Sequence, residues 1–217
     1  MPEAASAVIT FGGTFDPPHL GHLAVIKELR RLLDLPLVVV PTGIPGHRAA
    51  PGASPIQRAE MIEAAVQALN DRLVAVCRRE VELPQPTFTV DTVTAWRRER
   101  PARSLVLAMG SDVAAGLPHW KEVGRLLGQV KLLIFERPSV GEPGSVVLEE
   151  LRRRQLPLVG AEVIALDVPQ VEATGIRERI AAGIDARDLI PGPVADYIQA
   201  HGLYRAQPEL PLPAGAG

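Results

Sequence analysis

The sequence predicts an α/β fold: a doubly wound, mostly parallel sheet with helices on both faces and a small helical part at the C-terminal end. Three observations lead to this prediction. Short apolar runs recur along the 217 residues. Most of these runs are continuous rather than alternating, which is typical of strands buried on both faces. Helix-patterned segments separate them, and such alternation implies right-handed strand–helix–strand crossovers.

The expected strands coincide with six apolar runs, several of them rich in β-branched residues, which favour strands. These runs span residues 7–11, 37–40, 73–77, 105–109, 130–135 and 162–166. Because few of them alternate between apolar and polar residues, we expect both faces of the sheet to be covered.

Helical patterns fill the intervals between these runs. Residues 20–33 carry one apolar stripe, with charged residues on the remaining surface. The segment 54–69 opens with strong start signals, since Ser54 can be the N-cap, proline follows at the first helical position, and Gln57 completes a capping box. Further helices are expected from about residue 89, over 145–154 and over 192–204.

The chain is long enough for one domain or two small ones, and no linker divides it convincingly. We expect a single domain over residues 1–205, whose last forty or so residues contain the small helical part. Residues 206–217 are rich in proline, glycine and alanine, and we expect them to form a disordered tail.

Composition excludes several classes of protein. Lys and Arg (23) nearly balance Asp and Glu (25), which argues against a large basic face and a nucleic-acid partner, although a local anion pocket remains possible. A single cysteine, Cys77, excludes an internal disulfide and an all-cysteine zinc site. No apolar stretch approaches the roughly 18–20 residues that a membrane span needs. The N-terminus lacks a signal-peptide pattern, so we expect a cytoplasmic protein without a membrane partner.

The segment FGGTFDPPHLGH, residues 11–22, joins the first expected strand to the first helix. Gly12 and Gly13 would let a ligand approach the backbone closely, and the helix N-terminus favours an anion. His19 and His22 lie three apart on one side of the first turn, so both imidazoles can aim at one phosphate.

Neither common glycine-rich phosphate loop occurs in this segment. Without a P-loop lysine, two histidines and a distant arginine could neutralise phosphate charge. The structural alternative is a turn whose histidines cap the helix. A metal site is a weaker interpretation, because a histidine pair needs a third ligand and none is indicated nearby.

The segment VEATGIRERI suggests a second anion site. Thr174 can cap a helix beginning at Gly175, and Arg177 follows three residues later, so a hydroxyl, free N–H groups and a guanidinium would converge. Taken alone, the segment also fits an ordinary capped surface helix.

Together the two segments resemble the nucleotidyltransferase superfamily, with its G-x-F-D-x-x-H-x-G-H and S-T-x-x-R motifs. Further segments resemble the bacterial nicotinate-nucleotide adenylyltransferase family. They read PTGIPGHR, SPIQRAEMIEAA, TFTVDT, MGSDVAAGLPHWKEVGRLL, FERP and LIPGPVADYIQAHGLY, and they extend the likeness over residues 9–204. The resemblance implies a Rossmann-like nucleotidyltransferase fold. Departures are Ala173 and Gly175 in the second motif, Glu136 in place of serine before Arg137, and a missing second proline in IPGHR.

The resemblance implies transfer of AMP from ATP to nicotinate mononucleotide, with nicotinate adenine dinucleotide and pyrophosphate as products. The attacking 5′-phosphate has a second pKa near 6, so it is mostly ionised at neutral pH and needs no general base. Catalysis would then depend on positioning and on stabilisation of charge at the α-phosphorus. His22 would contact the α-phosphate, His19 the β- or γ-phosphate, and Arg177 with Thr174 the leaving pyrophosphate. Mg²⁺ is expected on ATP, held mostly by phosphate oxygens and waters.

The remaining site residues are also assigned by resemblance. The expected ATP-binding residues are Gly12, Gly13, Thr14, Phe15, Gly110, Asp112, Thr174 and Ile176. The expected residues for nicotinate mononucleotide are Asp16, His47, Arg48, Thr89, Trp120 and Arg137. Trp120 is the expected stacking surface for the pyridine ring, with a role in the core as its alternative.

Three alternatives remain open from the sequence. Phosphopantetheine adenylyltransferases share both end motifs, cytidylyltransferases share the H-x-G-H element but act on CTP, and a non-catalytic nucleotide-binding regulator would tolerate Ala173. The oligomeric state is undetermined, and a homo-oligomer is possible.

Overall fold

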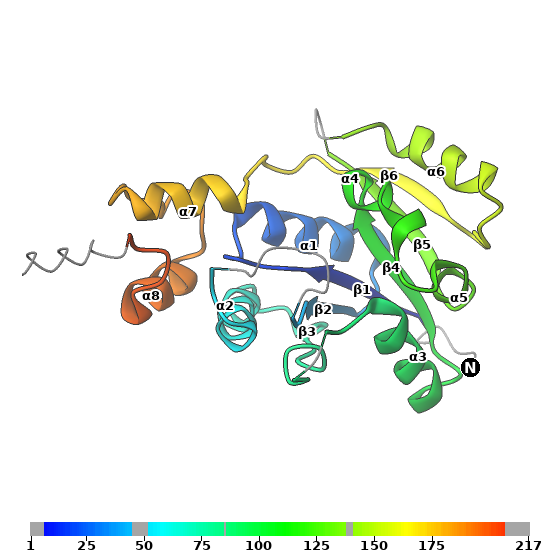
Figure 1. Cartoon of the computed structure of the whole chain (residues 1–217), viewed down its shortest axis with the longest axis horizontal. Helices are drawn as coiled ribbons and strands as arrows, with labels where there is room; N and C mark the ends of the chain where they lie inside the picture. Colours follow the sequence, from blue (N-terminus) through cyan, green and yellow to red (C-terminus); the bar gives the residue numbers. More distant parts are fainter. Residues whose placement is uncertain (1–6, 45–51, 85, 138–140, 207–217) are drawn as a thin grey trace, which may run out of the picture.

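A computed structural model describes residues 7–44, 52–84, 86–137 and 141–206. Its centre is a six-stranded sheet in the order β3-β2-β1-β4-β5-β6, in which every neighbouring pair is parallel (Figure 1). The strands are β1 Ala7–Gly13, β2 Leu37–Pro41, β3 Val74–Val76, β4 Ser104–Gly110, β5 Lys131–Glu136 and β6 Glu162–Ala165. Each strand overlaps one of the six predicted runs, which confirms the fold class.

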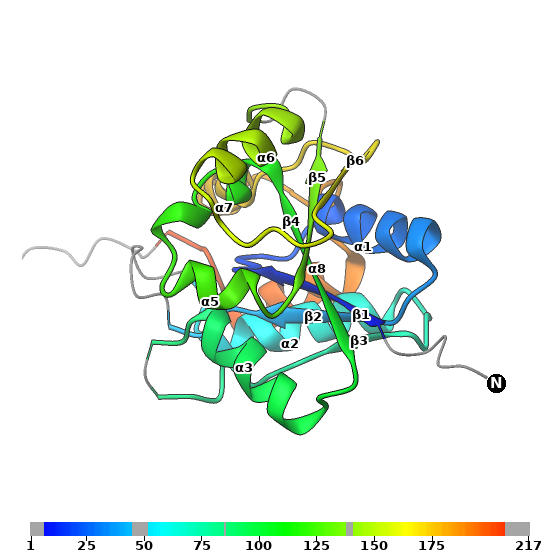
Figure 2. The same cartoon turned by 90° about the vertical axis from the view of Figure 1, so that its right-hand side faces the viewer.

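Side chains of each central strand enter two cores, one on each face of the sheet. In β1, Val8 packs into one core while Ile9 and Phe11 pack into the other. The two-residue period of a strand causes this division, because successive side chains point to opposite faces. Figure 2 shows β1 and β2 crossing β4 and β5 steeply, which reflects the normal twist of such a sheet.

Helices cover both faces. Buried residues of α1 (Leu20–Leu33), α2 (Pro55–Gln67) and α8 (Gly192–His201) belong to the first core, with Ile176 of α7 (Ala173–Ala181). Buried residues of α3 (Thr89–Glu99), α5 (Val123–Leu127) and α6 (Gly144–Arg153) belong to the second. The short elements α4 (Ser111–Ala114) and η1 (Leu117–His119) follow β4.

Local sequence accounts for several helix ends. Ser54 caps α2 as predicted: its Oγ accepts from the Gln57 N–H at 3.3 Å, and Gln57 Oε1 accepts from the Ser54 N–H at 2.9 Å. The predicted cap of α7 is wrong, because the helix begins at Ala173 and its N-cap is Glu172. The backbone of Glu172 is still extended, so Thr174 already lies inside the first turn.

The helical C-terminal part consists of α7 and α8, which lie at the opposite end of the long axis from α5 and α6 (Figure 1). The Tyr197 hydroxyl of α8 donates to Glu60 of α2. Residues 207–217, most of the predicted tail, lie outside the described residues. No helix among the described residues has the length and apolarity needed to cross a membrane.

Candidate active site

The candidate site lies at the carboxyl edge of the sheet, where β1 and β4 are neighbours. In chain order, β2 and β3 are added on one side of β1, and the next strand, β4, lies on the other side of β1. Ligands of doubly wound sheets bind at such a reversal of strand order. The loop from β1 to α1 and the start of α4 meet at this edge.

His19 and His22 form a stacked pair at the start of α1. Their ring centroids are 3.6 Å apart with an interplanar angle of 24°. His19 is the N-cap, and each Nδ1 accepts from the other residue's backbone N–H at 3.3 Å. Because each Nδ1 uses its lone pair, the neutral tautomer carries its proton on Nε2. The histidines therefore cap the helix, and each also keeps an N–H donor for a ligand.

The pair is uncharged at neutral pH in the absence of a ligand. Burial, followed by the positive charge of Arg137, lowers the pKa of His19 to about 4. Burial also lowers the pKa of His22, followed by the effects of His19 and Arg137. These shifts favour neutral Nε2–H donors in the pair, while a bound phosphate would act in the opposite direction, because a nearby negative charge favours the charged imidazolium.

Arg177 reaches this loop from the other end of the chain. Its Nη1 donates to the backbone oxygen of Asp16 at 2.7 Å, and its Nη2 donates to Thr174 Oγ1 at 3.1 Å. The guanidinium remains partly exposed and so can meet a ligand. Ile176 is fully buried in the core, so its predicted contact with ATP could come only from its backbone.

The residues after β1 are held in a tight arrangement. Phe15 is buried with φ 53°, a backbone conformation that bulky residues rarely adopt. Its ring meets that of His22 edge-on, with centroids 4.9 Å apart. A Cβ at Gly13 would lie 2.8 Å from the Phe15 ring, so Gly13 is needed for this packing whether or not a ligand approaches it. Gly12 is exposed and Thr14 is half-buried.

Gly110 and Asp112 lie at the end of β4. Gly110 is the N-cap of α4, and Asp112 lies in the first turn of that helix. Asp112 Oδ2 pairs with Arg137 Nη2 at 3.2 Å. The positive charge of Arg137 also lowers the pKa of both histidines.

The residues expected around nicotinate lie on and beside α3. Thr89 is the first residue of α3 and is half-buried. Trp120 follows η1 and is half-buried against the second core, so the structure leaves both the stacking and the packing interpretations open. His47 and Arg48 lie outside the described residues.

Arg58 is a site-supporting residue to which the sequence analysis assigned no role. It is fully buried, and its Nη1 donates to the Thr14 oxygen at 2.6 Å. Its Nη2 donates to the oxygens of Thr42 at 2.7 Å and Gly43 at 2.9 Å. The guanidinium thus ties the loop after β1 to the loop after β2. The only signal in the sequence was its place in the segment SPIQRAEM.

Glu80 is a second buried charged group without a predicted role. Its carboxylate accepts from the Thr92 hydroxyl at 2.7 Å and the Thr87 hydroxyl at 3.3 Å. Burial raises the pKa of Glu80, which the two hydroxyl donors oppose. The segment TFTVDT therefore has a structural anchor beneath the start of α3.

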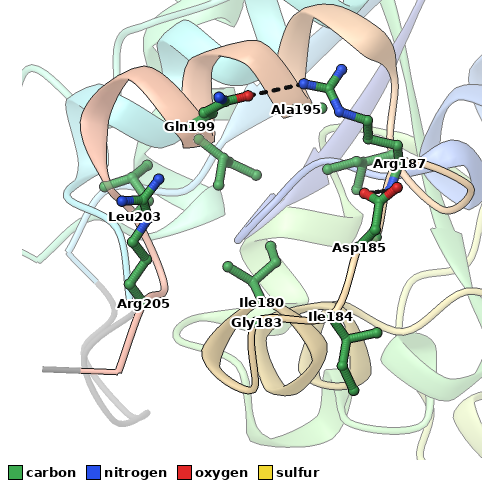
Figure 3. A pocket seen from close by; sticks show the side chains of 12 residues that line it. Ile180, Gly183, Ile184, Asp185, Arg187, Ala195, Gln199, Leu203 and Arg205 are labelled. Atoms are coloured by element: carbon green, nitrogen blue, oxygen red, sulfur yellow. Dashed lines mark hydrogen bonds between the residues drawn. The ribbon is translucent and has the colours of Figure 1, made fainter.

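No group of three or more metal-ligating side chains occurs among the described residues. Two cavities of about 340 and 480 Å³ lie near α7 and α8. Figure 3 shows the first, lined by Ile180, Ile184, Arg187 and their neighbours, and neither His19 nor His22 lines either cavity. We therefore assign the candidate site from the residues grouped around the loop between β1 and α1, and not from the volume of a cavity.

Comparison with known proteins places the chain in a family. The profile of the family described as Cytidylyltransferase-like matches residues 10–179. A probable nicotinate-nucleotide adenylyltransferase of Stenotrophomonas maltophilia is 36% identical over 214 residues, covering 91% of this chain and 96% of the relative. One from Shigella boydii is 35% identical over 208 residues, with coverages of 90% and 97%.

Solved structures agree in fold. The nicotinic acid mononucleotide adenylyltransferase of Plasmodium falciparum complexed with NaAD superimposes with a TM-score of 0.68 at 18% identity, covering 92% of this chain and 97% of that one. At this identity the likeness concerns the fold alone. The family match and the curated relatives go further: the chain belongs to the cytidylyltransferase-like family and, within it, to the nicotinate-nucleotide adenylyltransferases.

Proposed function

We propose that this chain transfers AMP from ATP to nicotinate mononucleotide, forming nicotinate adenine dinucleotide and pyrophosphate. One observation carries the proposal: a stacked histidine pair in the first turn of α1 and a guanidinium 161 residues beyond Asp16 both lie at the loop between β1 and α1. The names of the curated relatives support the same reaction.

The reaction is an in-line displacement at the α-phosphorus. An ionised phosphate oxygen of the mononucleotide forms the new bond, and the bond to the bridging oxygen of the β-phosphate breaks. Pyrophosphate leaves with that electron pair, so no proton transfer is required at neutral pH. We assign His22 to the α-phosphate, His19 to the β- or γ-phosphate, and Arg177 with Thr174 to pyrophosphate. Neutral Nε2–H donors would strengthen their hydrogen bonds as negative charge develops on the phosphate oxygens.

We assign the other ligand-binding residues to two groups, one for each substrate. The ATP side comprises Gly12, Gly13, Thr14, Phe15, Gly110, Asp112 and the backbone of Ile176. The mononucleotide side comprises Asp16, His47, Arg48, Thr89, Trp120 and Arg137. Both carboxylate oxygens of Asp16 already accept hydrogen bonds from protein groups, so its contribution is positional unless those bonds open.

Mg²⁺ enters with ATP. The carboxylate of Asp16 is occupied by N–H and O–H donors, and that of Asp112 is paired with Arg137. This donor set fits a magnesium ion held by phosphate oxygens and waters, because Mg²⁺ commonly keeps several waters beside substrate phosphates.

Pyrophosphate release with a panel of substrates tests the proposal. We expect release with ATP and nicotinate mononucleotide, and little with phosphopantetheine or with CTP in place of ATP. His22→Ala should lower kcat by at least about 100-fold, as loss of one transition-state donor does, while circular dichroism remains unchanged. Tight ATP binding without release for any co-substrate would instead favour a regulator.

Selectivity for the acid form needs a separate comparison. The first turn of α3, which begins at Thr89, offers N–H groups and a positive dipole end to a ring carboxylate. We therefore expect kcat/KM to be higher for nicotinate mononucleotide than for nicotinamide mononucleotide. Equal values for the two would remove the acid-specific claim and leave adenylyl transfer in place.

A further inference from the structure

Three segments distant in sequence meet the buried side chain and backbone of Asp16. Its Oδ1 accepts from the Ala53 N–H at 3.0 Å and from the Tyr204 hydroxyl at 2.7 Å. Its Oδ2 accepts from the Gly52 N–H at 2.8 Å, and its backbone oxygen accepts from Arg177 at 2.7 Å. Asp16 is 5% exposed, so these donors replace the water that an ionised carboxylate would otherwise bind.

Tyr204 reaches Asp16 through an unusual backbone path. After α8, Gly202 has φ 61° and Tyr204 itself has φ 62°, a left-handed conformation that is uncommon for residues other than glycine. Such conformations persist where the surroundings hold them. The ring lies against Gly52, where a Cβ would approach two ring carbons to 3.0 Å. Burial and the neighbouring Asp16 raise the pKa of Tyr204, so the phenol stays a proton donor.

The groups that Asp16 holds are related to both sides of the proposed site, one by its assigned role and the other by its place in the sequence. Arg177 is assigned to the leaving pyrophosphate. In the sequence, Gly52 and Ala53 follow the segment that carries His47 and Arg48, and they precede Ser54, the N-cap of α2. A shift of the Asp16 carboxylate would therefore disturb both sides of the site.

We propose that Tyr204 is a positioning residue for adenylyl transfer, which holds Asp16 and thereby orients Arg177 and the Gly52–Ala53 segment. The expected effect on adenylyl transfer rests on the proposed function, whereas the ordering of the Gly52–Ala53 segment does not. It gives the C-terminal end of the described chain a defined role, because the last aromatic side chain there completes the support of a loop 188 residues away.

Tyr204→Phe and Tyr197→Phe form a matched pair. Tyr204→Phe keeps the ring against Gly52 and removes only the donor to Asp16. Tyr197→Phe removes a hydroxyl that donates to another carboxylate, Glu60, from the same C-terminal part. We expect Tyr204→Phe to lower kcat/KM about ten-fold, as loss of a hydrogen bond to a charged acceptor does, with part of the loss in kcat. Tyr197→Phe should stay within about two-fold of the parent.

Melting temperatures of both variants separate positioning from general destabilisation. If kcat/KM falls in both variants, and in proportion to the fall in melting temperature, the loss reflects general destabilisation and the proposal is overturned. So would a Tyr204→Phe protein with the activity of the parent.

Hydrogen exchange gives a readout that needs no activity. Exchange at the Gly52 and Ala53 amides should be at least about five-fold faster in Tyr204→Phe than in the parent, and unchanged in Tyr197→Phe. Equal exchange in all three proteins would overturn the proposal. If the parent releases no pyrophosphate with any co-substrate, the proposed function fails, while the exchange experiment still decides whether Tyr204 orders this segment.

Discussion

At the level of single residues, burial determines the chemistry of the site more than residue type does. His19 is 5% exposed, and its pKa of about 4 makes it a neutral donor at neutral pH. Arg58 is fully buried and serves as a clamp between two loops rather than as a surface charge. In both cases the environment, and not the side chain alone, decides the role.

The lowered pKa of His19 links stability to pH. The unfolded chain binds the proton near pH 6.5 and the folded chain only near pH 4, so stability is fully present above 6.5 and falls towards pH 4. Between pH 7 and pH 5 the His19 contribution to the free energy of unfolding should fall by roughly 2 kcal/mol. His19→Asn keeps an N-cap acceptor without the titration. Urea unfolding of both proteins at the two pH values measures the difference, and an equal change with pH in the two proteins would contradict the prediction.

Replacement of Arg58 by lysine should lower the stability of the protein. Arg58→Lys leaves one ammonium where a planar fork now meets the oxygens of Thr14, Thr42 and Gly43. Loss of one or two of these charge-assisted hydrogen bonds should cost about 2 kcal/mol in the free energy of unfolding. Chemical denaturation measures the cost. The control Arg125→Lys, an exposed residue paired with Glu122, should change little.

At the level of helices and strands, the helix N-termini are closed in different ways. The start of α1 is closed by the histidine pair, and that of α2 by a serine–glutamine capping box. Glu136 Oε2 accepts from the first N–H of α6, that of Gly144, at 2.7 Å. The glutamate that departs from the family pattern thus has a structural partner here.

The capping box of α2 has a measurable effect on stability. Ser54→Ala removes the acceptor of the Gln57 N–H and should lower the free energy of unfolding by about 1 kcal/mol. Ser54→Asp keeps a capping oxygen and should retain most of the stability. Thermal or urea unfolding of the two variants distinguishes them, and equal losses would indicate that the cap contributes nothing.

At the level of the complete chain, parallel topology brings distant segments to one edge. The loop after β1, the start of α4, the end of β5 and α7 are far apart in sequence, yet all supply proposed ligand-binding groups. The C-terminal part does not stand apart from this arrangement, because Tyr197 joins α8 to α2 and Tyr204 joins the chain end to Asp16.

Truncations test this organisation and our proposal of a single domain over residues 1–205. Removal of residues 207–217 takes away none of the contacts described here, so activity and melting temperature should stay close to those of the parent. Removal of residues 204–217 also deletes the donor to Asp16 and should lower kcat/KM at least as much as Tyr204→Phe. Two truncated proteins with the same activity would contradict this prediction.

Sequence patterns alone were enough to predict the six strands and most of the longer helices, but not the short elements α4, η1 and α5. Six apolar runs became six strands, Ser54 and Gln57 formed their predicted box, and the histidine pair lies at the start of α1 as its spacing required. These features are local, since neighbouring residues and backbone geometry decide them. The likeness of several motifs to one family also indicated the reaction, because those motifs can be read directly from the order of residues.

Charge states and long-range supports depend instead on how the chain packs. The neutrality of His19 and His22 follows from desolvation and from Arg137, and no spacing in the sequence encodes burial. Arg58 lies 44 residues from Thr14, and Tyr204 lies 188 residues from Asp16. Such pairs cannot be predicted from spacing, because a buried polar group must find its partner wherever the folded chain supplies one, and distance along the chain has no bearing on that choice.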